Sequence, residues 1–202
     1  MRKHLRMGAA GALAIALASL TGAGVAYANG GHHAPTVATG STTCNFHGAL
    51  SAASGATVSI TGNITPHKHS RACTNTGGTR LRTGHVGRTP LASSTTTTGI
   101  CSLLTGGSLP DLAGGTIRWS PPHKVAASTG VALTGGSVSV VAVGSDSFLQ
   151  VAYTGGSVAG GSFTNASGGA LTVTSRDDIA ALTAACAQGP MSAISFAGTI
   201  TL

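Results

Sequence analysis

Histidine side chains are the residues of this chain that are best suited to metal chemistry. His67 and His69 flank Lys68, and alternate residues of an extended chain point the same way, so both imidazoles could contact one metal ion. His47 and His85 are candidates for the third and fourth ligands. The same segment also has the composition of a solvated basic loop, which is the simpler interpretation. A metal site built from these four histidines is therefore one hypothesis.

Acidic residues are too few to suggest hydrolysis by paired carboxylates. The chain has four aspartates and no glutamate: Asp111, Asp146, Asp177 and Asp178. Asp177 and Asp178 fall in the predicted first turn of a helix, where the helix dipole favours negative charge. That leaves only Asp111 and Asp146, both in turn-like contexts, to flank a glycosidic bond. The G-x-S-x-G nucleophile motif is absent, so no catalytic residue and no cofactor are expected.

Basic residues gather in one segment, consisting of Lys68, Arg71, Arg80, Arg82 and Arg88. No acidic residue occurs between residues 29 and 110, so this segment would attract anionic cell-wall polymers or lipid headgroups. No aromatic side chain lies near the segment to stack on a base, so nucleic acid is not an expected partner. A solvated loop without a partner is the alternative.

The first 28 residues have the pattern of a secretory signal peptide. A basic start precedes an uncharged apolar run over residues 8–25, and Ala26 and Ala28 are the small residues that signal peptidase reads. The run barely reaches the length of a membrane span, which makes an N-terminal anchor the less favoured alternative. Cleavage is predicted after Ala28, and the protein is expected to be secreted and extracellular.

The mature chain is expected to consist of a flexible arm over residues 29–42 and a single β-rich domain over residues 43–202. No transmembrane segment is expected after cleavage. A transmembrane barrel would need girdles of aromatic residues, and aromatic residues make up 3% of the chain.

The four cysteines, Cys44, Cys73, Cys101 and Cys186, all follow the predicted cleavage site. An even number in an exported chain predicts two disulfides, and no spacing fits a zinc site. The favoured pairing is Cys44 with Cys73 and Cys101 with Cys186. It assumes that residues 44–50 and 57–65 form a hairpin and that a strand over residues 93–100 precedes Cys101. Pairing Cys73 with Cys101 and Cys44 with Cys186 remains the main rival.

Apolar and polar residues alternate with the period of a half-buried strand over residues 44–50, 58–65, 116–120, 171–174 and 194–202. This pattern predicts an all-β fold, either an antiparallel β-sandwich or a barrel-like domain. Thr-Gly-Gly-Ser at residues 105–108, 134–137 and 154–157 is interpreted as hairpin turns between strands.

One short helix is expected near the C-terminus. Ser175 is the predicted N-cap, and Gly189 with Pro190 ends the helix. The face that it would bury carries Ile179, Leu182, Ala185 and Cys186.

Several segments together resemble a family of uncharacterised secreted proteins from actinobacteria. They are an early Cys44-Asn45 strand, a second strand leading to Cys73, Gly-Ile-Cys at 99–101, Thr-Ile-Arg-Trp at 116–119, Gly-Gly-Ser-Phe at 160–163, Ala-Ala-Cys at 184–186 and a terminal Gly-Thr-Ile-Thr-Leu strand. The resemblance covers about residues 44–202 and implies a secreted, disulfide-containing β-rich fold without an assigned activity.

These observations predict a secreted, non-enzymatic protein with a structural or ligand-binding role. The alternative is a metal- or polyanion-binding module at the cell surface, and a hydrolase is the third hypothesis.

Overall fold

The computed structural model describes residues 41–66, 72–75, 83–96, 99–120, 128–160, 163 and 168–202. The predicted signal peptide, residues 29–40 of the predicted arm, and His67 and His69 lie outside these residues. So do Lys68, Arg71, Arg80 and Arg82, and of Arg88 only the backbone is described.

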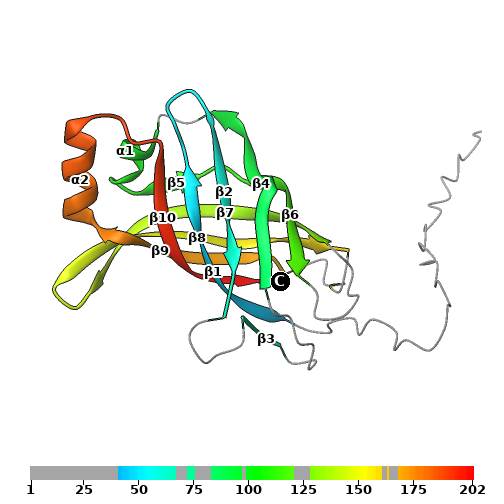
Figure 1. Cartoon of the computed structure of the whole chain (residues 1–202). Helices are drawn as coiled ribbons and strands as arrows, with labels where there is room; N and C mark the ends of the chain where they lie inside the picture. The colour runs from blue at the N-terminus through cyan, green and yellow to red at the C-terminus, as the bar shows by residue number, and fades with distance from the viewer. Residues whose placement is uncertain are drawn as a thin grey trace, which may run out of the picture. The chain divides into compact units, whose positions relative to one another are not determined.

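The described chain is built almost entirely from strands (Figure 1). They are β1 (Thr42–Ser51), β2 (Thr57–Ile64), β3 (Cys73–Asn75), β4 (Thr83–Thr96), β5 (Gly107–Leu109), β6 (Leu112–Ser120), β7 (Ser128–Val143), β8 (Asp146–Ala159), β9 (Ala170–Asp178) and β10 (Ala193–Thr201). Two helices, α1 (Ile100–Leu103) and α2 (Ile179–Gln188), interrupt them. The predicted all-β class is confirmed.

Eight of these strands close into an antiparallel barrel. The sheet runs β10-β9-β8-β7-β6-β4-β2-β1, and β1 pairs in turn with β10 over nine residues, from Thr43 opposite Thr201 to Ser51 opposite Ala193. The short strands β3 and β5 add to β1 and β7 at the ends of the barrel. The sandwich alternative is wrong, because pairing of the first and last strands leaves one continuous sheet instead of two facing ones.

Apolar side chains fill the interior, as an eight-stranded barrel of this size allows. The largest fully buried side chains are Tyr153, Phe46, Phe163, Phe196, Leu50, Ile64, Leu91, Ile100, Leu112, Ile117, Leu133 and Leu149. Except for Ile100 of α1 and Phe163, they come from seven of the eight barrel strands, so the alternation read in the sequence is the inward-facing pattern of the barrel wall.

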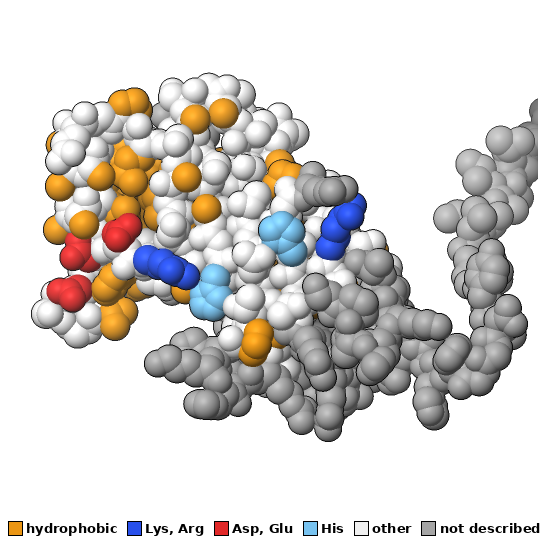
Figure 2. Space-filling view, viewed as in Figure 1, with side chains coloured by type: hydrophobic (Ala, Val, Ile, Leu, Met, Phe, Trp, Pro, Cys, Tyr) orange, Lys and Arg blue, Asp and Glu red, His pale blue; other side chains and the backbone are white. Residues whose placement is uncertain are grey.

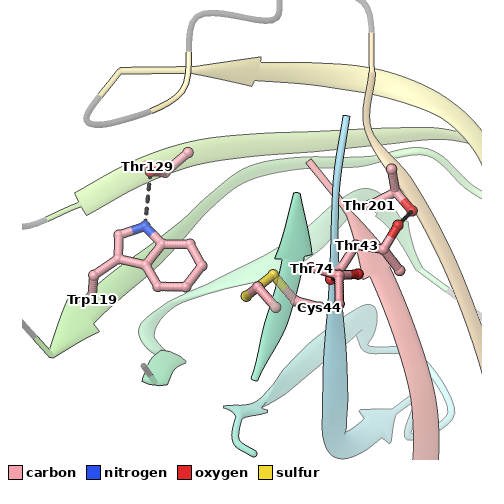
Figure 3. Close-up of a disulfide and its surroundings, with 7 residues drawn as sticks. Thr43, Cys44, Thr74, Trp119, Thr129 and Thr201 are labelled. Carbon is pink, nitrogen blue, oxygen red and sulfur yellow. Dashed lines mark hydrogen bonds between the residues drawn. A yellow bond between two sulfur atoms is a disulfide. The ribbon is translucent and has the colours of Figure 1, made fainter. Parts of the chain in front are cut away.

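Two aromatic side chains of the interior have polar partners, whereas the buried Thr42 Oγ1 has none among the described residues. The Trp119 Nε1–H donates to Thr129 Oγ1 at 2.9 Å (Figure 3). The Trp119 ring lies 5.5 Å from that of Phe163. Tyr153 donates its hydroxyl to the Pro110 carbonyl at 3.1 Å. Burial raises the pKa of Tyr153, and the nearby Asp111 carboxylate adds to this effect, so the hydroxyl stays a neutral donor.

Two of the Thr-Gly-Gly-Ser segments are not turns, contrary to the prediction. Residues 134–137 lie inside β7 and residues 154–157 inside β8, and the two segments overlap across the strand pair where Thr134 pairs with Gly155. In β7 the buried residues before this point are odd-numbered, Val131 and Leu133, and those after it are even-numbered, Gly136 and Val138. The inward face of the strand therefore shifts by one residue.

Glycine permits this change of face. Gly135 adopts φ 68°, which favours glycine, and a Cβ at Gly136 would collide with the ring of Tyr153. The third segment, at residues 105–108, joins α1 to β5 instead of two strands. The turn that does join β7 to β8 is the Gly144-Ser145 pair.

The helices also differ from the prediction. Asp178 is the N-cap of α2, and its Oδ1 accepts the N–H of Ala181 at 2.7 Å, while Ser175 lies in β9. The predicted strand over residues 93–100 ends at Thr96, and the chain forms the one-turn helix α1 from Ile100. There are thus two helices among the described residues, and Gly189 ends α2 as expected.

Disulfides join Cys44 to Cys73 and Cys101 to Cys186, the same two pairs that the sequence favours. The hairpin behind that reasoning is present, since Phe46 pairs with Ile64 and Ser51 with Ser59. The chain then returns as β3, which places Cys73 opposite Cys44 (Figure 3). The second disulfide links α1 to α2. Two disulfides indicate an oxidising, non-cytoplasmic setting.

Within the described ranges, no helix is long and apolar enough to cross a membrane.

Candidate functional site

Four polar side chains form a line across neighbouring strands of the barrel. In the register of the sheet, His47 of β1 pairs with Asn63 of β2, Asn63 pairs with His85 of β4, and His85 pairs with Arg118 of β6. Paired residues in antiparallel strands share a face, and neighbouring strands lie about 4.8 Å apart. We call His47, Asn63, His85 and Arg118 the polar row, and it spans about 14 Å of the barrel wall.

The polar row lies on the outer face of the barrel. The residues next to it along each strand, such as Phe46, Ile64 and Trp119, are buried in the interior. Because successive side chains of a strand point to opposite faces, the row must point outward. Asn63, His85 and Arg118 are exposed, and His47 is half-buried.

One hydrogen bond orients the centre of the row. His85 Nδ1 lies 2.6 Å from Asn63 Oδ1, and because an amide oxygen only accepts, the imidazole nitrogen is the donor. The amide nitrogen of Asn63 therefore keeps two N–H groups for another acceptor. The His85 ring lies over Gly87, where any Cβ would collide with Nε2, so the glycine gives the imidazole room to lie along β4.

His47 adds a further donor at the end of the row. Its Nδ1 is buried and has no hydrogen-bond partner among the described residues. A buried N–H without an acceptor is costly, which favours the tautomer with an unprotonated Nδ1 and the proton on Nε2. His47 then offers an N–H at Nε2, on the other side of the ring.

Arg118 carries the fixed positive charge of the row. No carboxylate in the described part of the chain pairs with its guanidinium. The aspartates lie elsewhere: Asp111 precedes β6, while Asp146, Asp177 and Asp178 lie at the β7–β8 turn and the start of α2. Figure 2 shows the acidic side chains gathered at one end of the visible face, away from the histidines. The row is rich in donors and poor in acidic neighbours.

This arrangement suits an anion better than a metal ion. The structure brings His47 and His85 into one row, but Asn63 separates them and Arg118 lies beside His85. No cluster of three or more His, Cys, Asp or Glu side chains occurs in the described ranges. The other two predicted ligands, His67 and His69, lie outside those ranges.

The two candidate hydrolytic carboxylates are far apart. Asp111 Oδ1 accepts the N–H of Gly135 at 3.1 Å, whereas Asp146 follows the β7–β8 turn and accepts from Ser145 Oγ at 3.2 Å. The stretch of β7 from Gly135 to Val143, the partner of Asp146, spans about 26 Å. Paired catalytic carboxylates lie within about 10 Å of each other, so these two cannot act on one bond.

The described surface also carries two depressions. One, of about 300 Å³, is lined by small residues of β6, β7 and β8, including Gly114, Gly130, Ala132 and Ser157. The other, of about 230 Å³, lies between the β7–β8 turn and the start of α2 and contains Asp146 and Asp178. Neither touches the polar row.

Sequence reasoning missed Asn63 and Arg118 as members of a site. Both lie in strands that were correctly expected, on the polar faces of residues 58–65 and 116–120. The sequence does show that each of these polar faces carries a side chain with several hydrogen-bond donors. It does not show that β4 lies between β2 and β6, which is what brings Asn63 and Arg118 into one row.

Comparison with known protein families, curated proteins and solved structures finds no match for this chain.

Proposed function

We propose that this chain is an exported, non-enzymatic binding protein that holds an anionic polymer against the outside of its barrel. The polar row carries the proposal, because it places a guanidinium that pairs with no carboxylate of the described residues beside imidazole and amide donors. Phosphate, sulfate and carboxylate groups are the acceptors that such donors bind best.

The charge of the predicted mature chain supports the same partner. Residues 29–202 hold eight Lys and Arg residues and four Asp, a formal net charge of 8 − 4 = +4. Four residues of the basic segment, Lys68, Arg71, Arg80 and Arg82, fall in sequence between β2 and β4, the two strands that carry Asn63 and His85, and Arg88 lies in β4 itself. Long-range attraction by a positive protein raises the local concentration of an anionic polymer before specific contacts form. An anionic cell-wall polymer is the proposed natural partner.

Export is the second part of the proposal. It rests on the signal-peptide pattern of residues 1–28 and agrees with the two disulfides. Intact-mass measurement of the protein from culture supernatant should give a chain that begins at Asn29. A full-length chain retained with the cells would contradict this part.

Binding is tested on the mature protein with heparin and polyphosphate as sulfated and phosphorylated probes. We expect salt-sensitive retention on both, because each phosphate or sulfate contact displaces counterions. Arg118→Ala should lower the salt concentration needed for elution, and Asn63→Ala should do so less.

Arg176→Ala is the matched control, since Arg176 is also an exposed arginine but lies on β9 next to Asp177. Equal effects of Arg118→Ala and Arg176→Ala would mean that only net charge matters and would overturn the polar row as the site. Retention on immobilised copper that is lost in the His47→Ala/His85→Ala variant, without heparin retention, would favour the metal hypothesis instead.

A further inference from the structure

The hairpin formed by β7 and β8 extends beyond the strands that flank it. On the β7 side, the pairing with β5 reaches only to Val138, which lies opposite Gly107, the first residue of β5. On the β8 side, β9 ends with Asp178 opposite Phe148. Beyond Val138, residues 139–143 of β7 pair with β8 and have no strand on their other edge within the described chain. Figure 1 shows this hairpin, in yellow, projecting past the barrel.

The free edge presents unpaired backbone groups at defined residues. In an antiparallel pair closed by a two-residue turn, the residues flanking the turn exchange both hydrogen bonds, and every second residue does so thereafter. Here Val143 pairs with Asp146 across Gly144-Ser145. The N–H and C=O groups of Val140 and Ala142 therefore point to the free edge.

The same edge carries the exposed apolar side chains. Val140 is 49% exposed and Val143 is 60% exposed, and they are the two exposed large hydrophobic residues of the described ranges. Free strand edges are normally protected by lysine, proline or a bulge. Residues 128–145 contain no charged residue and no proline, so nothing in this strand discourages pairing with another strand.

We propose that residues 139–143 pair antiparallel with the same residues of a second copy of this chain, forming a dimer across a twofold axis at Val141. In this register Val140 lies opposite Ala142 of the second copy, and Ala142 lies opposite Val140 of the second copy. The outward N–H and C=O groups of these residues can then form hydrogen bonds across the twofold axis. A twofold arrangement uses the edge once and closes, which avoids an open fibre.

Charge favours this edge as the contact between two copies. Two copies carry the same positive net charge, and their repulsion is smallest where no charged side chain lies at the contact. The edge of β7 over residues 139–143 has no charged residue, and no residue of the basic segment belongs to β7. Identical uncharged, β-branched strands also pack well against each other.

Sedimentation equilibrium of the mature protein over a wide concentration range tests this proposal. We expect a concentration-dependent dimer. Val140→Lys should weaken dimerisation about tenfold or more, because it places two like charges at the paired edge. Thr172→Lys, which adds the same charge at an exposed position of β9, is the matched control and should leave the dimer intact.

Ala142→Pro gives a second, independent variant. The N–H it removes faces the free edge, so the pairing of β7 with β8 should survive while the dimer is lost; circular dichroism reports whether the fold is kept. A protein that stays monomeric at all concentrations would overturn the proposal. So would Val140→Lys and Ala142→Pro variants that fold and dimerise like the parent protein.

Discussion

Ser93 and Ser175 make the same pair of hydrogen bonds in two different parts of the barrel. Ser93 Oγ accepts the N–H of Val58 at 3.0 Å and donates to the Thr95 carbonyl at 2.8 Å. Ser175 Oγ accepts the N–H of Leu149 at 3.0 Å and donates to the Asp177 carbonyl at 2.7 Å. Each serine is buried and lies where the register between two strands shifts, so each hydroxyl replaces a backbone bond that the bulge breaks.

The two serines also precede the two helices that the second disulfide joins. β4 with Ser93 leads to α1 and Cys101, and β9 with Ser175 leads to α2 and Cys186. A bulge bends a strand, so at each site the chain turns from the barrel wall toward a helix. The disulfide between Cys101 and Cys186 then links the two helices that follow these bends.

Replacing either serine by alanine should destabilise the fold. Ser93→Ala and Ser175→Ala each leave a buried backbone N–H without an acceptor, which costs about 1–3 kcal/mol. Urea unfolding of the mature protein measures this loss. Ser195→Ala, at an exposed position of β10, is the control and should change the unfolding free energy by less than about 0.5 kcal/mol. An unfolding free energy unchanged by both buried substitutions would contradict the assigned role.

Gly136→Ala should destabilise the barrel by about 1–3 kcal/mol, because the new methyl group overpacks against the Tyr153 ring and Leu109. Gly130→Ala, in the same strand, is the matched control, since its Cβ would meet only the Ala159 carbonyl oxygen at 3.5 Å. Thermal unfolding of both variants tests the prediction. Equal midpoints would mean that Thr-Gly-Gly-Ser is not needed for the change of face in β7 and β8.

Tyr153 should make the protein lose stability in alkali. Its pKa is raised in the folded chain, mainly by burial, whereas an unfolded tyrosine titrates near pH 10. Up to that pH both states keep the proton. Above it the unfolded chain loses its proton first, so the free energy of unfolding falls as pH rises.

Denaturant unfolding on either side of pH 10 measures this effect. Tyr153→Phe should show a smaller fall, because it has no hydroxyl to ionise, although it loses the hydrogen bond to Pro110 at every pH. A Tyr153→Phe variant with the same alkaline fall as the parent would show that another group is responsible.

The disulfide pairing can be checked by peptide mapping without reduction. We expect peptides that contain Cys44 with Cys73 and Cys101 with Cys186. A Cys73–Cys101 peptide would contradict the observed topology. Removing the second bridge by Cys101→Ala/Cys186→Ala should lower stability by about 3–5 kcal/mol, because it releases a loop of 85 residues in the unfolded chain.

The sequence by itself determined β1, β2, β6, β9 and β10, in whole or in part, and their inward faces. Residues 44–50, 58–65 and 194–202 alternate strictly, and a strand buries every second residue wherever its neighbours lie. The start of β1 and the end of β2 also had to meet once a hairpin was assumed, which brought Cys73 near Cys44. These are local consequences of chain geometry.

Tertiary structure alone decided the closure of the sheet, the change of face at Thr-Gly-Gly-Ser and the polar row. Glycine pairs suit both turns and strand bends, and only the pairing of Thr134 with Gly155 distinguishes them. Asn63 and Arg118 are ordinary polar residues of half-buried strands until β4 lies between β2 and β6. Such pairings join residues far apart in sequence, and local propensity does not encode which strands become neighbours.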